Sequence, residues 1–115
     1  MLKKSNRLKK KEDFDRVLKE GKAFKESFLL LKIKKNKLIS NRFGFIISQK
    51  VSKKAVARNK IKRRLSELIR INLDKLKKGI DGIFIVLPGL EKKSFKELKE
   101  IIINIFKKAE LFKND

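Results

Sequence analysis

Hydrophobic residues near the start of the chain follow a helical period. Phe14, Val17 and Leu18 stand at i, i+3 and i+4 within 11–20, acidic residues precede them, and Gly21 follows directly. This spacing places the apolar side chains on one side of a helix, and glycine is common just past a helix end. The pattern therefore predicts a short amphipathic helix over 11–20.

The next two apolar segments have the composition and alternation of strands. Alternate residues over 27–34 point to the same face of a strand, and on one of the two faces those over 29–33 are all apolar. The other face is partly polar. The residues of the apolar face are Leu29, Leu31 and Ile33. A polar connection over 36–41 leads to a segment rich in β-branched and aromatic residues over 42–51. We therefore expect two strands joined as a hairpin.

The second half of the chain predicts a long helix and then a buried strand. Residues 52–79 keep a helical period, with a break expected near Asn72. Lysines precede Gly79, as cations do at a helix C-terminus. The continuous apolar run over 79–89 stops at Pro88, which is typical of a strand buried on both faces.

A last helix is predicted by a capping box at Ser94-Phe95-Lys96-Glu97. Its apolar positions are Phe95, Leu98, Ile102, Ile105, Phe106 and Ala109. The order helix, strand, strand, helix, strand, helix predicts an α+β fold. With 115 residues and no linker or repeat, we expect a single domain over 1–115, with flexible ends at 1–6 and 113–115.

The chain carries 34 Lys and Arg against 13 Asp and Glu, a formal net charge of +21. Such a charge repels itself unless a polyanion neutralises it, so nucleic acid is the expected partner, ahead of an anionic membrane surface. Lysine is abundant together with isoleucine and asparagine, as biased nucleotide composition would also produce. Because the chain has no cysteine, no signal-like apolar stretch and no apolar run near the roughly 20 residues of a membrane span, we expect a cytoplasmic protein.

Arginine, unlike lysine, is concentrated in one segment. Four of the seven arginines lie in ARNKIKRRLSELIR, residues 57–70. On a helical wheel its apolar residues share a sector about 100° wide, and a separate stripe lies about 130° away. The apolar sector holds Ile61, Leu65, Leu68 and Ile69; the stripe holds Asn59, Arg63, Ser66 and Arg70; Arg58 and Lys62 lie between them.

Arginine suits phosphate because its planar fork donates to two oxygens at once and is less costly to desolvate than lysine. Asparagine adds both a donor and an acceptor. We therefore interpret the stripe as a docking surface for phosphates and sugar edges, with a solvated basic face as the alternative. The strand pattern before this helix does not fit a helix-turn-helix motif.

Four segments in order resemble the protein subunit of bacterial ribonuclease P. Arg58-Asn59-Lys60-Ile61-Lys62-Arg63 is similar to the family's R-N-x-x-K-R helix signature. The other three segments are RLKKKEDFDRVLKEGK (7–22), RFGFIISQKVSKKAVARN (42–59) and GIDGIFIVLPG (79–89). The resemblance spans about 6–112 and implies an α/β sandwich with a mainly antiparallel four-stranded sheet and a left-handed crossover. The pattern of the sequence itself places three strands.

The resemblance implies a subunit that binds a large catalytic RNA and the single-stranded 5′ leader of precursor tRNA, whose removal gives mature 5′ ends. The implied contacts with the catalytic RNA are Arg58, Asn59, Lys62, Arg63 and Arg70, preceded by Lys53 and Lys54. The implied leader contacts, in a cleft between the first helix and the sheet, are Phe14, Leu18, Leu31, Arg42 and Lys50.

Some positions depart from the family pattern. Leu18 and Leu31 stand where some relatives have aromatic residues, which weakens base stacking. Ser66 stands where many relatives have an arginine, so Arg64 or Arg70 would have to supply that phosphate contact. Each implied contact also has a structural alternative: the core for Phe14, Leu18 and Leu31, a carboxylate partner for Arg42, and solvation for Lys53 and Lys54.

The chain lacks the usual groups of a protein nuclease. It has no histidine or cysteine, and its carboxylates are scattered; the densest set, Glu12, Asp13 and Asp15, fits the first turn of a helix. We therefore expect no catalytic and no metal-binding residues, with RNA and its bound Mg²⁺ carrying the chemistry. The competing classes are a ribosomal or nucleoid protein and an amphipathic membrane-surface protein; we expect no membrane and no stable protein partner.

Overall fold

The computed structural model describes residues 2–113, which form three α-helices and a four-stranded sheet. The α-helices are α1 (Lys11–Glu20), α2 (Ala55–Asn72) and α3 (Phe95–Lys108). The strands are β1 (Lys22–Glu26), β2 (Leu29–Lys35), β3 (Arg42–Ile47) and β4 (Ile80–Val86), and the 3-10 helices are η1 (Lys4–Asn6), η2 (Leu73–Lys75) and η3 (Leu90–Lys92). The predicted α+β class is confirmed, and none of the described helices is long and apolar enough to cross a membrane.

The sheet has the order β1-β2-β4-β3, so the predicted hairpin between 27–34 and 42–51 is wrong. β4 lies between β2 and β3, antiparallel to the first and parallel to the second. Burial explains this arrangement, because six of the seven residues of β4 are buried. A strand that is apolar on both faces needs neighbours on both edges and layers on both sides, and the centre of the sheet supplies both.

The strand that the sequence pattern did not place is β1. It pairs antiparallel with β2, with Phe24 opposite Leu31, and Ser27 adopts a φ of 54° in the turn between the two strands. Its sequence KAFKE is exposed or half-buried throughout. Short, lysine-bearing strands are typical of sheet edges, where pairing with another chain must be discouraged. Such a strand has too few apolar residues to show a clear alternation.

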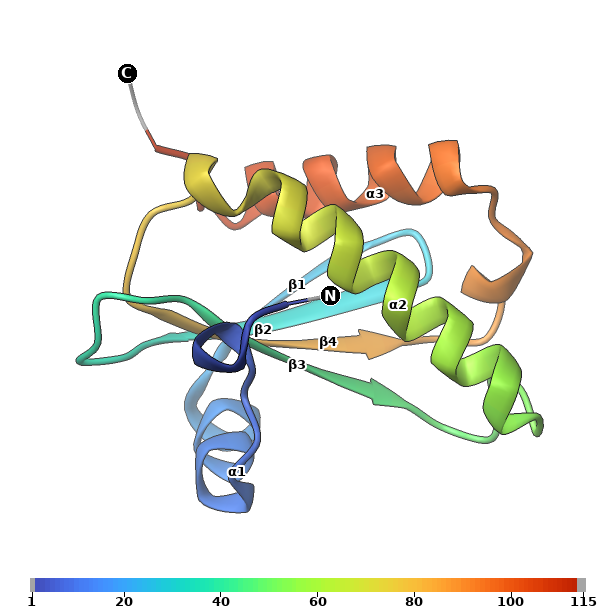
Figure 1. Ribbon diagram of the computed structural model, residues 1–115, viewed down its shortest axis with the longest axis horizontal. Helices are drawn as coiled ribbons and strands as arrows, with labels where there is room; N and C mark the ends of the chain where they lie inside the picture. Colours follow the sequence, from blue (N-terminus) through green and yellow to red (C-terminus); the bar gives the residue numbers. More distant parts are fainter. Residues whose placement is uncertain (1, 114–115) are drawn as a thin grey trace.

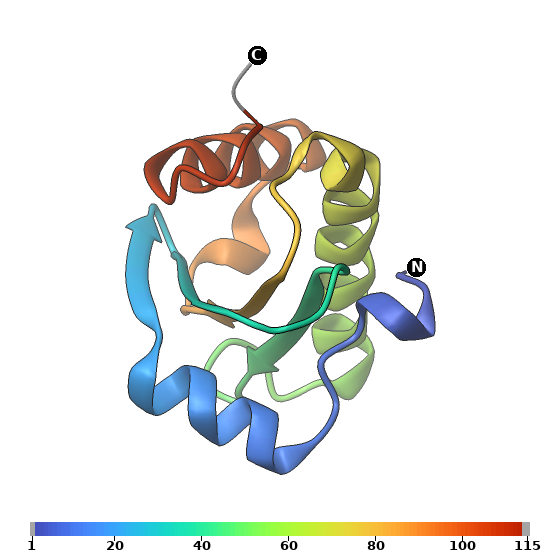
Figure 2. The same cartoon turned by 90° about the vertical axis from the view of Figure 1, so that its left-hand side faces the viewer.

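α2 connects the parallel strands β3 and β4 across one face of the sheet (Figures 1 and 2). This crossover is left-handed, as the resemblance implied, whereas nearly all such connections are right-handed. α2 and α3 together cover this face, while α1 lies on the opposite face (Figure 2). The two faces of the sheet therefore differ in how completely they are covered.

The main core lies between the sheet and the pair α2 and α3. Its centre is a cluster of three rings, Phe43, Phe84 and Phe106, whose centroids lie 5.8 to 6.2 Å apart. Aromatic pairs at this separation gain more than their buried area alone. A smaller apolar cluster fills the space between α1 and the other face; its buried members are Leu8, Val17 and Ile83.

α2 ends at Asn72, where the break was predicted, so the helical prediction over 52–79 is corrected to 55–72. The side-chain amide of Asn72 donates to the carbonyl oxygen of Leu68 at 2.8 Å, and η2 follows. Leu76 then forms an antiparallel bridge with Phe112, and Lys77 N donates to the carbonyl oxygen of Leu111. Lys77 and Lys78, directly before Gly79, therefore lie in a connection beside the C-terminal segment and not at a helix end.

Within the predicted flexible end at 1–6, residue 1 lies outside the described residues, and the segment 2–6 packs against the domain. Leu2 is buried, and Asn6 is buried with its side-chain amide donating to the carbonyl oxygen of Asn41 at 2.8 Å. Arg7 forms a parallel bridge with Phe43 at the edge of β3. This edge strand offers free backbone groups, and the N-terminal segment satisfies one of them. At the other end, 114–115 of the predicted flexible tail lie outside the described residues.

The predicted capping box of the last helix is confirmed. Ser94 Oγ accepts from Glu97 N at 3.1 Å, and Ser94 N donates to Glu97 Oε1 at 2.9 Å. The predicted apolar positions are buried, except that Phe95 is 43% exposed and lies outside the core. Phe95 is the first residue of α3, so its side chain lies at the end of the helix and remains partly in solvent.

Replacing Ser94 with alanine should lower the free energy of unfolding by about 1 kcal/mol, because one helix N-terminal N–H loses its acceptor. Urea unfolding followed by circular dichroism measures this change. The matched control is Ser5→Ala, since Ser5 is exposed and makes no side-chain hydrogen bond within the described residues. Equal unfolding midpoints for the two variants would show that the capping box contributes nothing to stability.

Candidate nucleic-acid interface

The inner side of α2 is the one that the helical wheel predicted. Ile61, Leu65, Leu68 and Ile69 are all buried against the main core. This placement follows from their spacing, which keeps them on one side of the helix over three turns. The side of α2 away from the core is therefore exposed at positions such as Asn59, Lys62 and Arg63.

Three residues of the signature segment lie together on the exposed side of α2. Asn59, Lys62 and Arg63, with Val56, line an open hollow on the surface. All three are exposed, and within the described residues none of them forms an ion pair or a side-chain hydrogen bond. Two cations and an amide without protein partners can donate to phosphate and sugar oxygens without first breaking an internal contact.

Arg58 is partly committed to the fold. One of its terminal nitrogens, Nη1, donates to the carbonyl oxygens of Ser52 and Lys53 at 2.8 and 3.1 Å. These contacts hold the loop between β3 and α2 against the first turn of the helix. Lys53 and Lys54 are exposed in this loop, immediately before α2. Arg58 therefore positions two of the lysines that the sequence predicted as RNA contacts.

Arg70 has a partner on its own helix. Its guanidinium donates twice to the carboxylate of Glu67 one turn earlier. This hydrogen bonding lowers the pKa of Glu67 and raises the pKa of Arg70. The net charge at this end of the stripe is therefore smaller than the count of arginines suggests.

Ser66 does not belong to the outward stripe, so that part of the wheel prediction is wrong. Ser66 is only 3% exposed. The reason is the N-terminal segment, which lies against this side of α2 (Figure 2) and, with residues such as Leu2 and Leu8, encloses the same cavity as Ser66. A wheel describes one helix and contains no information about a distant segment that covers it.

On the opposite face of the sheet, Phe14 and Leu18 lie together on the side of α1 that faces β3 and β4. Both are half-buried beside Ile46 and Ile85 in the smaller apolar cluster. Phe14 lies directly over Gly44: a Cβ atom at residue 44 would be 2.3 Å from Phe14 Cζ. Glycine is therefore required at this position for the ring to approach the strand so closely.

Leu31 does not lie beside Phe14 and Leu18. It is fully buried in the main core on the other face of the sheet, so its predicted role as a leader contact is wrong and its alternative role as core is correct. Side chains alternate along a strand, and the neighbours Leu30 and Lys32 face α1 instead. Lys32 Nζ donates to the carbonyl oxygen of Leu18 at 2.8 Å. The alternation predicted for 27–34 already contained this signal.

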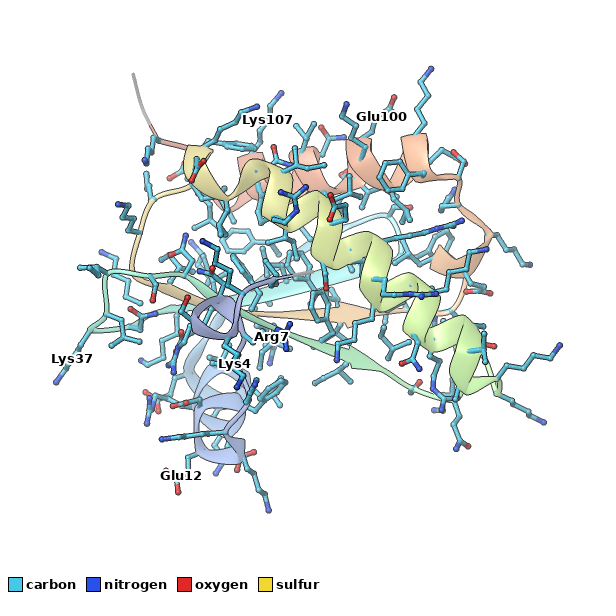
Figure 3. The ribbon with its side chains drawn as sticks, in the orientation of Figure 1. Lys4, Arg7, Glu12, Lys37, Glu100 and Lys107 are labelled. Carbon is cyan, nitrogen blue, oxygen red and sulfur yellow. The ribbon has the colours of Figure 1, made fainter. Side chains whose placement is uncertain are left out.

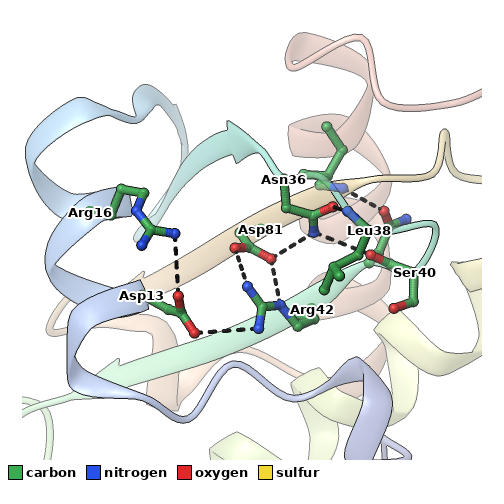
Figure 4. Close-up of polar contacts among 9 residues, drawn as sticks. Asp13, Arg16, Asn36, Leu38, Ser40, Arg42 and Asp81 are labelled. Carbon is green, nitrogen blue, oxygen red and sulfur yellow. Dashed lines mark hydrogen bonds and ion pairs between the residues drawn. The ribbon is translucent and has the colours of Figure 1, made fainter.

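Arg42 is held by two carboxylates (Figure 4). Its Nε and Nη2 donate to the two oxygens of Asp81 at 2.9 and 2.7 Å, and its Nη1 donates to Asp13 Oδ2 at 3.3 Å. Hydrogen bonding to Asp81 raises the pKa of Arg42 above its ordinary value. Arg42 thus joins α1 to β4 from its place on β3, as the alternative role of a carboxylate partner anticipated.

The network extends to the connection between β2 and β3. Asn36 donates from its side-chain amide to Asp81 Oδ1 at 2.8 Å and to the carbonyl oxygen of Ser40 at 3.2 Å, while its side-chain oxygen accepts from Leu38 N (Figure 4). Lys50 lies in the turn after the last residue of β3, whereas Arg42 is the first residue of that strand. The predicted leader contacts therefore form a pair at Phe14 and Leu18 and do not gather into one cluster.

Comparison with known proteins settles which family has this architecture. The family model described as Ribonuclease P matches residues 2–110. The chain belongs to the ribonuclease P protein family. The ribonuclease P protein component of Clostridium botulinum strain 657 is 38% identical over 110 residues, which cover 95% of this chain and 98% of that relative. The corresponding protein of Alkaliphilus oremlandii is 39% identical, with 96% of each chain covered.

Solved structures of the family have the same fold. The RNase P protein of Staphylococcus aureus superposes with a TM-score of 0.87 at 27% identity, covering 94% of this chain and 98% of that chain. The RNase P protein from Thermotoga maritima gives a TM-score of 0.81 at 30% identity, covering 89% and 96%. The sandwich predicted from the resemblance is therefore confirmed over nearly the whole chain.

Replacing Asp81 with asparagine should destabilise the domain by on the order of 3 kcal/mol, because it leaves the Arg42 guanidinium with an incomplete counter-charge in a largely buried site. The midpoint of chemical unfolding measures the effect. Asp15→Asn, an exposed carboxylate of α1 replaced in the same way, is the control and should stay within about 0.5 kcal/mol of the unchanged protein. Similar stabilities for both variants would contradict a structural role for the network.

Proposed function

We propose that this chain is the protein subunit of the ribonuclease P holoenzyme, which removes 5′ leaders from precursor tRNA by endonucleolytic cleavage in the cytoplasm. The observation that carries the proposal is the exposed, unpaired group Asn59, Lys62 and Arg63 on α2, in a chain that belongs to the ribonuclease P family. The net charge of +21 supports an RNA partner, since a polyanion neutralises it.

The catalytic RNA would bind along the exposed side of α2. Arg63 offers its whole guanidinium fork, and Lys62 and Asn59 lie in the same hollow. Lys53 and Lys54 extend this surface before the helix, and Arg58 keeps their loop in place while part of its guanidinium remains available. Arg70 lies on the same exposed side but shares its charge with Glu67. We therefore infer that the N-terminal half of α2 provides most of the binding free energy.

The leader of precursor tRNA would lie on the face of the sheet that α1 covers only in part. Phe14 supplies an aromatic ring there, and Leu18 supplies an apolar side chain beside it. Unpaired bases stack on such surfaces without sequence selectivity. Leu30 and Lys32 face the same side and take the place that the sequence assigned to Leu31. Lys50, exposed beyond the end of β3, would neutralise a phosphate farther along the strand.

The side chains of the protein would bind and position RNA, and the catalytic RNA would carry the chemistry. Among residues 2–113 no group of three or more carboxylates is placed to hold a metal ion. Asp13 and Asp81 converge on one site, but both are bound to Arg42. The two carboxylates that converge are therefore already engaged by a guanidinium, and we infer that Mg²⁺ is held by the RNA. The protein would raise affinity for the substrate by neutralising phosphates.

Replacing Arg63 with alanine should weaken assembly with a bacterial ribonuclease P RNA by about 1–3 kcal/mol, because a charged hydrogen bond to phosphate is lost. Filter binding at fixed salt measures it. Arg70→Ala removes the same charge from the same helix and should cost less, because Glu67 already neutralises that arginine. Equal losses for the two variants would mean that only total charge matters and would contradict a specific surface on α2.

The holoenzyme should prefer precursor tRNA with a leader over mature tRNA, and only when the protein is present. Phe14→Leu should reduce this preference by on the order of 1 kcal/mol, since one aromatic stacking surface is lost. Binding of the two RNAs to reconstituted holoenzyme measures the preference. Phe95→Leu, at a half-exposed phenylalanine on α3, is the control and should leave it unchanged.

Two outcomes of this reconstitution would count against the proposal. If the protein raised affinity equally for RNAs with and without a leader, the leader contact would be refuted. If it failed to stimulate leader cleavage at low Mg²⁺ while still binding the RNA, the chain would fit a ribosomal or nucleoid RNA-binding protein instead.

A further inference from the structure

A cavity of about 190 Å³ lies where the N-terminal segment, α1, β3 and α2 meet. Its apolar walls include Leu2 and Leu8 from the N-terminal segment, Phe14 from α1 and Phe45 from β3. Since one water molecule occupies roughly 30 Å³ in the liquid, the cavity has room for a group several times larger than water. Three phenylalanines line it, Phe14, Phe43 and Phe45, which favours a flat, partly apolar occupant.

The buried polar side chain of this cavity, Ser66, has no hydrogen-bond partner among the described residues. Ser66 lines the cavity and is only 3% exposed. Glu26 Oε2 is the one fully enclosed side-chain atom without a hydrogen-bond partner among the described residues, so the Ser66 hydroxyl keeps contact with open space and can bond to an occupant of the cavity. A hydroxyl both donates and accepts, so it would suit the polar edge of a ring that is otherwise apolar.

The mouth of the cavity is cationic. Arg7, Lys9 and Lys62 line it, and no carboxylate of the part of the chain that the structure describes does so. Arg7 is held in place by the bond from its Nε to the carbonyl oxygen of Leu2 at 2.7 Å, which leaves its two terminal nitrogens free to donate. Figure 3 shows Arg7 on the segment between η1 and α1. A fixed guanidinium with two lysines nearby favours an occupant that carries a phosphate.

The cavity continues into a groove beside β3. A second hollow of about 160 Å³ shares Phe45 and Lys62 with the cavity and is otherwise lined by Ile47, Arg58 and Asn59. The two hollows together follow the outer edge of β3, between that strand and α2. A chain lying along this groove would therefore pass from the signature segment of α2 to the N-terminal segment.

We propose that the cavity binds the base of one unpaired nucleotide of an RNA strand whose backbone follows the groove along β3. The base would lie against Phe14 and Phe45, the Ser66 hydroxyl would bond to its edge, and Arg7 would bind the adjoining phosphate. A free mononucleotide offers the same chemistry, but the continuous groove with cations along it fits a strand. This inference rests on the RNA-binding function proposed above and adds a base-binding site to it.

This site differs from the leader contact on the α1 face of the sheet. That contact uses Phe14 and Leu18 below the sheet, whereas the cavity lies at the edge of β3 beside α2. Phe14 is the one residue that belongs to both. A substitution at Ser66 therefore tests the cavity without removing a residue assigned to the leader or to the exposed side of α2.

The test compares short single-stranded RNAs that carry one abasic position with the intact RNA, using the full-length chain. For the unchanged protein, removal of one particular base should weaken binding about tenfold, as loss of one stacked base does. In Ser66→Leu, whose larger side chain fills the cavity, the intact and abasic RNAs should bind equally. Leucine favours helix, and thermal unfolding checks that the variant is folded.

A second pair of variants repeats the test without altering the interior. Lys9→Ala should weaken binding of the RNA more than Lys10→Ala, since both are exposed lysines before α1, only Lys9 lines the cavity, and neither belongs to the surface of α2. Adenosine 5′-monophosphate and ribose 5-phosphate serve as competitors. Stronger competition by the compound with a base supports the site, and equal competition by both overturns it, because the base would then contribute nothing.

The proposal is also overturned if no abasic position weakens binding to the unchanged protein, or if folded Ser66→Leu keeps the tenfold difference. These results would leave the wider function intact as long as the chain still assembles with ribonuclease P RNA. Failure of that assembly would instead refute the function on which the proposal rests, so the two failures are distinguishable.

Discussion

Burial of β4 on both faces is the constraint on which the other elements depend. Six of its seven residues are buried, and no edge position could hide both faces of such a strand. With β4 in the centre, β2 and β3 must take opposite edges of it, and helices must cover both sides. α2 and α3 cover one face of the sheet, and α1 covers part of the other face. The connection from β3 through α2 to β4 is left-handed because β3 lies along the edge of β4 opposite β2.

This arrangement also decides which cations are available to a partner. The chain has 34 basic residues and only 13 acidic ones, so most cations cannot have a carboxylate partner. The few carboxylates are used selectively: Asp13 and Asp81 hold Arg42 between α1 and β4, and Glu67 holds Arg70. Arg63 has no such partner among the described residues. The structure thus separates arginines that support the fold from an arginine that is free to bind phosphate.

The sequence predicted features that depend on local spacing and missed those that depend on distant segments. The extents of α1, the inner side of α2 and the capping box at Ser94 follow from residues within a few turns of each other. The order of strands, the burial of Ser66 and the packing of Leu2 depend on contacts between segments far apart in the chain. Leu31 is a different kind of error, because the predicted alternation already placed it with Leu29 on the apolar face.

Phe14 connects the two RNA-binding sites proposed here through a single ring. Its position depends on Gly44 beneath it, where any Cβ would lie 2.3 Å from the ring, and on Asp13, the preceding residue, which is bound to Arg42. The ring cannot move toward the sheet, and the ion pair restrains α1 from moving away. A base bound on either side would therefore meet a ring already held in place, and little conformational entropy would be lost on binding. At the sites proposed here, the ion pairs of Arg42 with Asp13 and Asp81 would thus support RNA binding through α1, without any contact between Arg42 and RNA.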